Sequence, residues 1–258
     1  MTGEGRPRVI AANWKMHKTV DEVADYFDGF RREAPAPEEG VEILFFPPFP
    51  ALSAVVEATA DREDVAVGAQ TCHWESKGAW TGEVSPRMVA ATGASRVLVG
   101  HSERRHHFGE TDERCARKLR AALEEGLAPT LCVGERLEQR EAGRARSVVV
   151  EQLTRAAEGL CREEYRRLAV AYEPVWAIGT GKTAAPDDAQ EMHAGIREIL
   201  ASIATPELAR TIPVLYGGSV KPHNAAELLS RPDVDGALVG GASLDPSDFA
   251  SIAAVARS

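Results

Sequence analysis

The chain has 258 residues, of which 44% are hydrophobic and 27% are charged, a composition typical of a folded globular protein. This length suits one α/β barrel of about 250 residues or two smaller domains. The formal net charge of -9 excludes the basic composition of a nucleic-acid binder. An anionic ligand would therefore need a locally positive site.

The cysteines and the N-terminal segment predict an intracellular protein. Cys72, Cys115, Cys132 and Cys161 include no CxxC pair of the kind that binds zinc or acts in redox exchange. Residues 1–7 lack the apolar core of a signal peptide, and no apolar stretch approaches the roughly 20 residues of a membrane helix. We expect reduced thiols, a cytoplasmic location and no membrane partner.

Short apolar runs alternate with longer amphipathic segments along the chain. The runs predict strands covered on both faces, at residues 8–13, 41–46, 65–70, 96–100, 129–133, 168–173, 212–216 and 234–240. Helical periodicity marks residues 21–33, 112–125, 144–160, 187–203 and 248–256. Gly126 follows the second of these as a C-cap, while Asp187 and Asp248 lie where acidic side chains favour a helix N-terminus.

This alternation predicts a parallel sheet with right-handed crossovers. Eight such units fit a closed (β/α)8 barrel, and we predict one barrel domain over residues 1–258. The alternative is an open doubly wound sheet, which usually has a glycine-rich fingerprint after its first strand. Here the first strand ends in Asn13-Trp14-Lys15, without GxGxxG.

Chemistry in such barrels takes place at the carboxyl ends of the strands. Polar or glycine residues follow most of the predicted strands at that end. In chain order they are Asn13, Lys15, Gln70, His101, Ser102, Glu103, Glu173, Gly217, Gly218, Ser219, Gly240 and Gly241. Each is weak evidence alone, but packing does not account for their joint placement.

The glycines after the last two predicted strands indicate a phosphate site. Gly217, Gly218 and Ser219 present backbone N–H groups and a hydroxyl, and Gly240 and Gly241 let the backbone approach an anion closely. Barrels often bind phosphate with the loops after strands 7 and 8. Taken singly, either glycine pair has the alternative interpretation of a simple chain reversal.

The segment from Ile178 to Thr183, IGTGKT, is compared with a nucleotide P-loop. That motif needs a glycine five positions before Gly181, where this chain has Trp176. We predict a lid instead, with Pro174 and Trp176 as its rigid start and glycines at its tip, closing over substrate to exclude water.

No metal site is expected. His101, His106 and His107 have neither HExxH nor Cys/His spacing, and the neighbouring Arg104 and Arg105 would repel a cation. We predict that His106 and His107 lie on the surface.

The motifs together resemble the triosephosphate isomerase family. They are NWKM at 13–16, GAQ at 68–70, TGE at 81–83, GHSERR at 100–105, LCVGE at 131–135, AYEPVWAIGTGKT at 171–183, YGGSV at 216–220 and VGGASL at 239–244. They cover nearly the whole chain in order, and GHSERR and AYEPVWAIGTGKT are highly specific.

The resemblance implies interconversion of dihydroxyacetone phosphate and D-glyceraldehyde 3-phosphate through an enediolate, without metal or organic cofactor. It makes Glu173 the base and His101, as neutral imidazole, the electrophile that polarises the carbonyl. It gives Lys15 the positive charge near the phosphate. Asn13, Gly179, Ser219, Gly240 and Gly241 would complete the substrate site, supported by Ser102, Glu103 and Thr81.

The resemblance also implies a homodimer. The segment from Thr71 to Ser85 is too long for a routine βα connection. By resemblance it is a protruding dimer loop, from which Thr81 reaches the partner's active site. Cys132 is expected to be a buried packing residue beside the site.

Some positions depart from the family pattern: Thr71, where asparagine is common, Trp80 in the dimer loop, Ala11 and Ala12 before Asn13, and His17.

Two alternative functions stay open. One is a family relative that isomerises a tetrulose phosphate, among which tryptophan occurs at the Trp80 position. The other is a non-catalytic barrel that binds sugar phosphate as a sensor, against which the intact Glu173, His101 and Lys15 argue.

Overall fold

The strands form a closed barrel of eight parallel strands in sequence order, seen in a computed structural model that describes residues 6–34, 36, 39–178 and 184–256. Each strand pairs with the next, and β8 pairs with β1 to close the ring. The predicted (β/α)8 barrel is thereby confirmed. The strands are β1 (Arg8–Asn13), β2 (Val41–Phe46), β3 (Val65–Ala69), β4 (Arg96–Val99), β5 (Ala128–Val133), β6 (Ala169–Tyr172), β7 (Val214–Tyr216) and β8 (Gly236–Val239).

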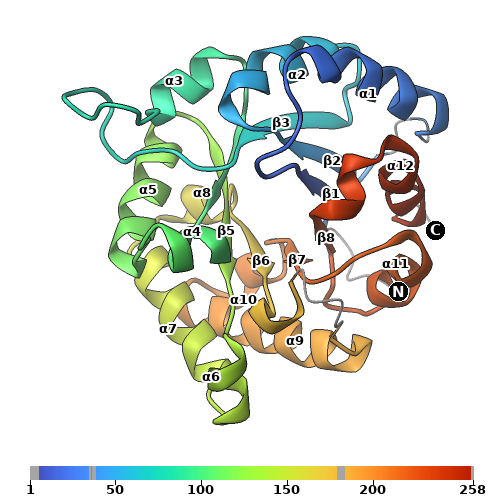
Figure 1. Cartoon of the computed structure of the whole chain (residues 1–258). Coiled ribbons are helices and arrows are strands. Elements are labelled where there is room, and N and C mark those ends of the chain that lie inside the picture. The colour runs from blue at the N-terminus through green and yellow to red at the C-terminus, as the bar shows by residue number, and fades with distance from the viewer. Residues whose placement is uncertain (1–5, 35, 37–38, 179–183, 257–258) are drawn as a thin grey trace.

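Helices surround this ring of strands (Figure 1). The α-helices are α1 (Asp21–Glu33), α2 (Leu52–Ala58), α3 (Pro86–Ala91), α4 (Ser102–His107), α5 (Asp112–Glu124), α6 (Leu137–Glu141), α7 (Ala145–Ala157), α8 (Arg162–Tyr165), α9 (Pro186–Ile203), α10 (Pro206–Ala209), α11 (Pro222–Leu229) and α12 (Pro246–Val255). Short 3-10 turns are η1 (Phe49–Ala51), η2 (Val175–Ala177) and η3 (Gly241–Leu244). Within the described part of the chain, no helix combines the length and apolarity needed to cross a bilayer.

The boundaries of these elements refine the sequence prediction. β1 and β2 match it, and β5 begins one residue earlier than predicted. The remaining strands are shorter than predicted, so Gln70, Gly100, Glu173 and Gly240 lie just beyond their strands. Helix α12 begins at Pro246, two residues before Asp248, because Asp245 is its N-cap. The Asp245 side chain accepts hydrogen bonds from the N–H groups of Ser247 and Asp248. The short helices α2, α3 and α11 escaped prediction because they span few periods.

The core has two layers, one inside the barrel and one between strands and helices. The interior layer includes Leu44, Leu98, Leu215 and Cys132, and Cys132 is fully buried as predicted. Neighbouring backbones approach so closely that a Cβ on Gly134 would lie 1.8 Å from the Glu173 carbonyl oxygen. Glycine at 134 therefore allows the end of β6, which carries Glu173, to pack against β5.

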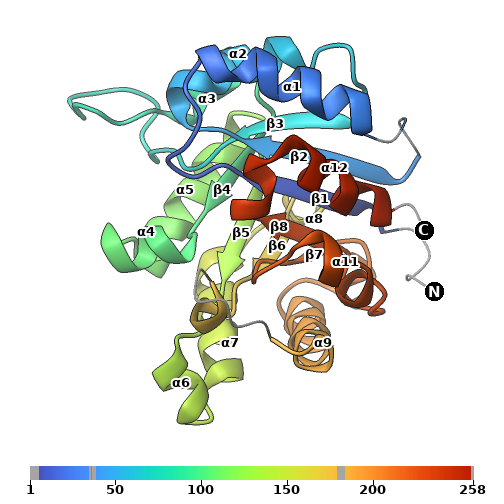
Figure 2. The same cartoon turned by 45° about the vertical axis from the view of Figure 1, so that its right-hand side comes forward.

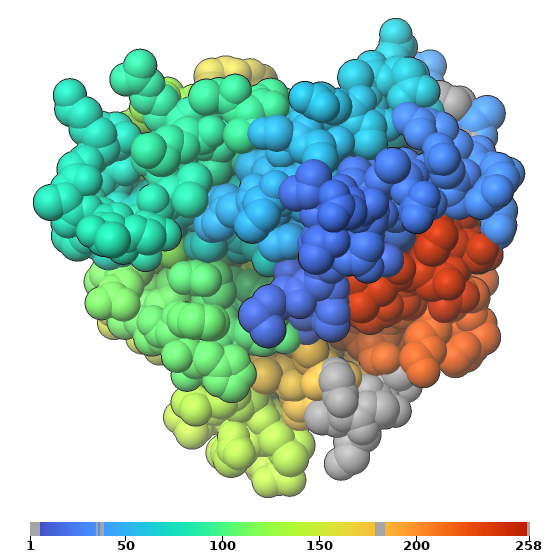
Figure 3. Space-filling view, turned by 45° about the horizontal axis from the view of Figure 1, so that its top comes forward, coloured from blue at the N-terminus to red at the C-terminus, as the bar shows by residue number. Residues whose placement is uncertain are grey.

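The connection between β3 and α3 projects from the body of the molecule in two views (Figures 1 and 2), and in Figure 3 it forms the upper left corner of the surface. An aromatic stack holds it in shape. The His73 ring lies 4.2 Å from that of Trp74 and 4.7 Å from that of Trp80, and the Arg117 guanidinium lies 4.2 Å from the Trp74 ring. The projection is thus an ordered feature of the single chain.

Candidate active site

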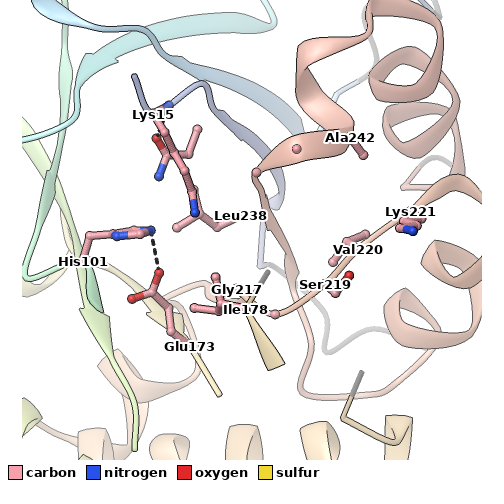
Figure 4. A pocket seen from close by; sticks show the side chains of 14 residues that line it. Lys15, His101, Glu173, Ile178, Gly217, Ser219, Val220, Lys221, Leu238 and Ala242 are labelled. Carbon is pink, nitrogen blue, oxygen red and sulfur yellow. Dashed lines mark hydrogen bonds and ion pairs between the residues drawn. The ribbon is translucent and has the colours of Figure 1, made fainter. Parts of the chain in front are cut away.

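A pocket of about 300 Å³ opens at the carboxyl ends of the strands (Figure 4). It brings together most of the residues singled out from the sequence. Its lining consists of Asn13, Lys15, His101, Glu173, Ile178, Gly217, Gly218, Ser219, Val220, Lys221, Leu238, Gly240, Gly241 and Ala242. Side chains that were predicted from four strand ends therefore share one cavity.

The centre of the pocket is a contact between Glu173 and His101. Glu173 Oε1 lies 2.9 Å from His101 Nε2, the contact dashed in Figure 4, and Glu173 Oε2 accepts from the Ser102 N–H at 2.7 Å. His101 in turn N-caps α4, where its Nδ1 accepts from the Glu103 N–H at 3.3 Å. In the neutral imidazole, with Nδ1 as acceptor, the proton is on Nε2, which donates a hydrogen bond to the carboxylate; in the charged imidazolium Nε2–H makes the same contact as an ion pair.

Burial and pairing act in opposite directions on the pKa values of this pair. Burial raises the pKa of Glu173, but the charge and hydrogen bond of His101 and the Ser102 N–H outweigh it, so the net pKa shift is downward. Burial lowers the pKa of His101, yet the facing Glu173 carboxylate makes its net pKa shift upward. Glu173 is therefore ionised at neutral pH, the state required of a base.

Lys15 reaches the pocket from an unusual backbone conformation. Its φ is +53°, in the left-handed region that residues other than glycine rarely adopt. The Asn13 side-chain oxygen accepts from the Lys15 N–H at 3.0 Å, and Gln70 Nε2 donates to the Lys15 carbonyl at 2.8 Å. Its Nζ pairs with Glu103 Oε1 at 2.5 Å. Polar contacts at both ends thus hold a strained residue in place at the pocket.

Glycines form the opposite rim, after β7 and β8. A Cβ on Gly217 would lie 2.9 Å from Glu173 Cγ, and one on Gly218 would lie 2.2 Å from the Tyr216 hydroxyl oxygen. A Cβ on Gly240 would be in van der Waals contact with Lys15 Cε, at 3.4 Å. The rim therefore exposes backbone where other residues would fill the pocket.

Three residues predicted to support the site, Ser102, Glu103 and Thr81, are not among those that line this pocket. Gly179, and with it the tip of the predicted lid, lies outside the described residues. Thr81 lies exposed on the projecting connection between β3 and α3 and does not line the pocket of its own chain. Among residues 6–34, 36, 39–178 and 184–256, no group of three or more His, Cys, Asp or Glu is placed to hold a metal ion. His106 and His107 are exposed in α4, as predicted.

A buried charge cluster behind His101 was missed from the sequence. Lys118 is 4% exposed, and its Nζ lies 2.6 Å from Glu110 Oε2 and 3.0 Å from Thr71 Oγ1. Glu110 also accepts from the Gly100 N–H at 2.8 Å and from Arg104 Nε at 3.0 Å. The cluster thereby holds the chain on both sides of His101. A lysine on the apolar face of the predicted helix 112–125 was the signal for it.

A second buried carboxylate lies below the start of the predicted lid. Glu135 is fully buried and accepts from the Tyr172 hydroxyl at 3.0 Å and from Trp176 Nε1 at 2.8 Å. These bonds connect the ends of β5 and β6 to η2. The predicted rigid start of the lid is therefore anchored to the barrel.

Fold and pocket together define a (β/α)8-barrel enzyme with a carboxylate–imidazole pair at the carboxyl ends of its strands. Residues 8–256 match the sequence profile of triosephosphate isomerase. The triosephosphate isomerase of Carboxydothermus hydrogenoformans is 50% identical over 250 residues, covering 96% of this chain and 98% of that protein. That of Symbiobacterium thermophilum is 50% identical over 252 residues, covering 97% of each. The chain belongs to the triosephosphate isomerase family.

Proposed function

We propose that Glu173 is the base, His101 the electrophile and Lys15 the fixed positive charge in the reaction of this family. The chain interconverts dihydroxyacetone phosphate and D-glyceraldehyde 3-phosphate. The observation that carries the assignment of roles is the contact of 2.9 Å between Glu173 Oε1 and His101 Nε2, inside a pocket with glycine backbone on its opposite rim.

Proton transfer needs a carboxylate that removes a proton beside the carbonyl and returns it to the neighbouring carbon. Glu173 is ionised, and its oxygens are engaged with His101 and the Ser102 N–H. To reach a substrate carbon, the carboxylate must leave these donors. Substrate binding would therefore exchange the ion-pair contact for a position beside the reacting carbon.

Once Glu173 moves away, His101 Nε2–H is free to donate to the substrate oxygen. Burial and the Glu103 N–H at Nδ1 both favour the neutral imidazole when the carboxylate no longer faces it. A donor placed where charge develops stabilises the enediolate. Ser102 acts in this scheme through its backbone N–H, and Glu103 acts through Lys15.

The phosphate group would lie against the glycine rim. Gly240 and Gly241 leave backbone accessible, Ser219 adds a hydroxyl, and Lys15 supplies positive charge close to Gly240. We include Gly179 as a further backbone donor, although it lies outside the described residues. Asn13 lines the pocket and acts chiefly by fixing the Lys15 backbone.

The activity test compares substrates of two lengths in a coupled assay. We expect kcat/KM for the triose phosphates to exceed that for a tetrulose phosphate by more than about tenfold, because the longer sugar adds a CHOH unit and even one extra methylene commonly provides discrimination of that size. A higher kcat/KM with the tetrulose phosphate would replace the proposed substrate. Absence of turnover with both would favour a binding barrel.

We also propose a homodimer through the segment from Thr71 to Ser85, with Thr81 reaching the partner's pocket. Large apolar side chains beside this segment support it: Met16 and Phe108 are 93% and 65% exposed and line a groove of about 320 Å³ next to Lys15.

We further propose a cytoplasmic location. All four cysteines are free thiols, three of them buried, which fits a reducing compartment.

Sedimentation equilibrium tests the dimer. We expect twice the chain mass of 27.8 kDa for the unmodified protein and a shift toward monomer for Met16→Glu. Val150→Glu, a charge placed on an exposed apolar residue of α7, is the matched control and should leave the mass unchanged. A monomeric unmodified protein would contradict the proposal.

A further inference from the structure

A buried hydrogen bond joins helix α1 to the turn η3 at the glycine rim. The Tyr26 hydroxyl donates to the Ser243 carbonyl oxygen at 2.8 Å. Tyr26 is 3% exposed and Ser243 is fully buried, and they are 217 residues apart in the sequence. A buried carbonyl that lost this donor would lack a partner for that bond, which costs free energy unless the turn moves.

The turn is closed on itself by Ser243. Its N–H and its hydroxyl both donate to the Gly240 carbonyl oxygen, at 2.8 and 2.7 Å. Gly241 and Ala242, which lie between these two residues, line the pocket. The turn therefore moves as a unit, and holding the Ser243 carbonyl holds the pocket-lining backbone.

The turn is open on its pocket side at Gly241. No heavy atom lies within 4 Å of the place that a Cβ on Gly241 would occupy. The turn is instead fixed from behind, where Tyr26 lies. Besides the packing of Ala242 and Leu244 against the core, the Tyr26 hydroxyl restrains the backbone that faces the pocket through a hydrogen bond from outside the turn.

Tyr26 also contacts the chain segment that carries Asn13 and Lys15 into the pocket. Its ring packs edge-on against Trp14, with centroids 4.8 Å apart, and Trp14 lies between Asn13 and Lys15 in the chain. Burial raises the pKa of Tyr26, so its hydroxyl stays protonated and able to donate. One side chain thus links the Lys15 segment with the turn after β8.

We propose that Tyr26 is a positioning residue for the phosphate end of the substrate, acting through the Ser243 carbonyl on the backbone of Gly240 and Gly241. This inference rests on the proposed placement of phosphate at that rim. Tyr26 does not line the pocket, so its effect is on how well the rim fits an anion and not on the proton transfer.

The test is Tyr26→Phe, which removes the hydroxyl and keeps the ring on Trp14. We expect the inhibition constant of inorganic phosphate and the KM for dihydroxyacetone phosphate to rise about threefold to tenfold, the effect of one hydrogen bond, with kcat little changed. The matched control is Tyr165→Phe. Tyr165 is equally buried at 3%, and its hydroxyl donates to the Ala157 carbonyl at 2.8 Å, between α8 and α7 and outside the pocket.

The control should lose stability without changing phosphate inhibition. Equal inhibition constants for the two variants would overturn the inference. If Tyr26→Phe does not fold, Ser243→Ala carries the test, because it removes the hydrogen bond from the Ser243 hydroxyl to the Gly240 carbonyl oxygen in the same turn. Phosphate inhibition should weaken likewise, and unchanged inhibition there would also overturn the inference. If phosphate does not compete with substrate in the unmodified enzyme, the proposed phosphate placement itself fails.

Discussion

The two sides of the pocket are built in different ways. On the side of β4 and β6, Glu173 and His101 are buried side chains bonded to each other and to backbone. On the side of β7 and β8, the rim is backbone at glycines, and after β7 side chains at Gly217 and Gly218 would collide with their neighbours. The first side stores reactive charge as an ion pair, and the second provides a preformed surface. We therefore expect substitutions on the first side to affect rates and those at the rim to affect binding.

The largest expected effect follows from Glu173→Gln, which keeps the shape of the side chain and removes the carboxylate that we propose as the base. We expect kcat to fall on the order of 10²–10⁴-fold, the usual contribution of a positioned base. Inhibition by inorganic phosphate should change little, because the rim is untouched. Steady-state kinetics with both triose phosphates measure this. Glu227→Gln on exposed α11 is the control, and near-normal turnover of Glu173→Gln would remove Glu173 from the role of base.

The next effect concerns the charge cluster behind His101. Lys118→Met leaves Glu110 paired with Arg104 alone in a buried site. Removing one partner of a buried ion pair is strongly destabilising, and we expect a loss of about 3 kcal/mol in the free energy of unfolding. Urea denaturation measures it. Adding Glu110→Gln removes the buried carboxylate charge that lost Lys118 and should recover part of the loss. A single variant as stable as the unmodified chain would mean that the cluster adds nothing.

Lys15→Met tests the charge that joins the two sides. Met is unbranched like Lys, so the backbone at φ +53° bears similar strain in both. We expect phosphate to bind about 10- to 100-fold more weakly, since a charge-assisted hydrogen bond is lost. Lys221→Met, in the same pocket, is the comparison. A larger loss in Lys221→Met would place the essential charge there.

The sequence was sufficient for the barrel and for placing most of the polar and glycine residues of the pocket at one end of it, because both follow from periodicity and from where polar residues end apolar runs. It was not sufficient for the contacts between them. Ser102 and Glu173 are 71 positions apart, and Tyr26 and Ser243 are 217 apart, and no local pattern reports such pairings. The Lys118 cluster was missed as well, although a lysine on the apolar face of a helix is a local signal for a buried partner.

The smallest effect, and the most direct test of the stored ion pair, is the pKa of His101. In the unmodified enzyme the Glu173 carboxylate raises this pKa against burial, Glu103 raises it further, and Lys15 lowers it. Glu173→Gln removes the largest raising charge, so the pKa of His101 should fall below its value in the unmodified enzyme, as followed by NMR of the imidazole ring. An unchanged pKa would mean that the pair is not coupled in solution.

The same coupling fixes the sign of the pH dependence of stability. The pKa of Glu173 is depressed below its ordinary 4.5, so its contribution is present above that value and is lost as pH falls through the lower, folded value. The pKa of His101 is raised above 6.5, so its contribution is complete below 6.5 and is lost as pH rises through the folded value. The pair should therefore stabilise the fold most between about pH 4.5 and 6.5, where both charges are present. In Glu173→Gln this advantage should vanish, so denaturation at pH 5.5 and pH 8 should differ less for the variant than for the unmodified chain.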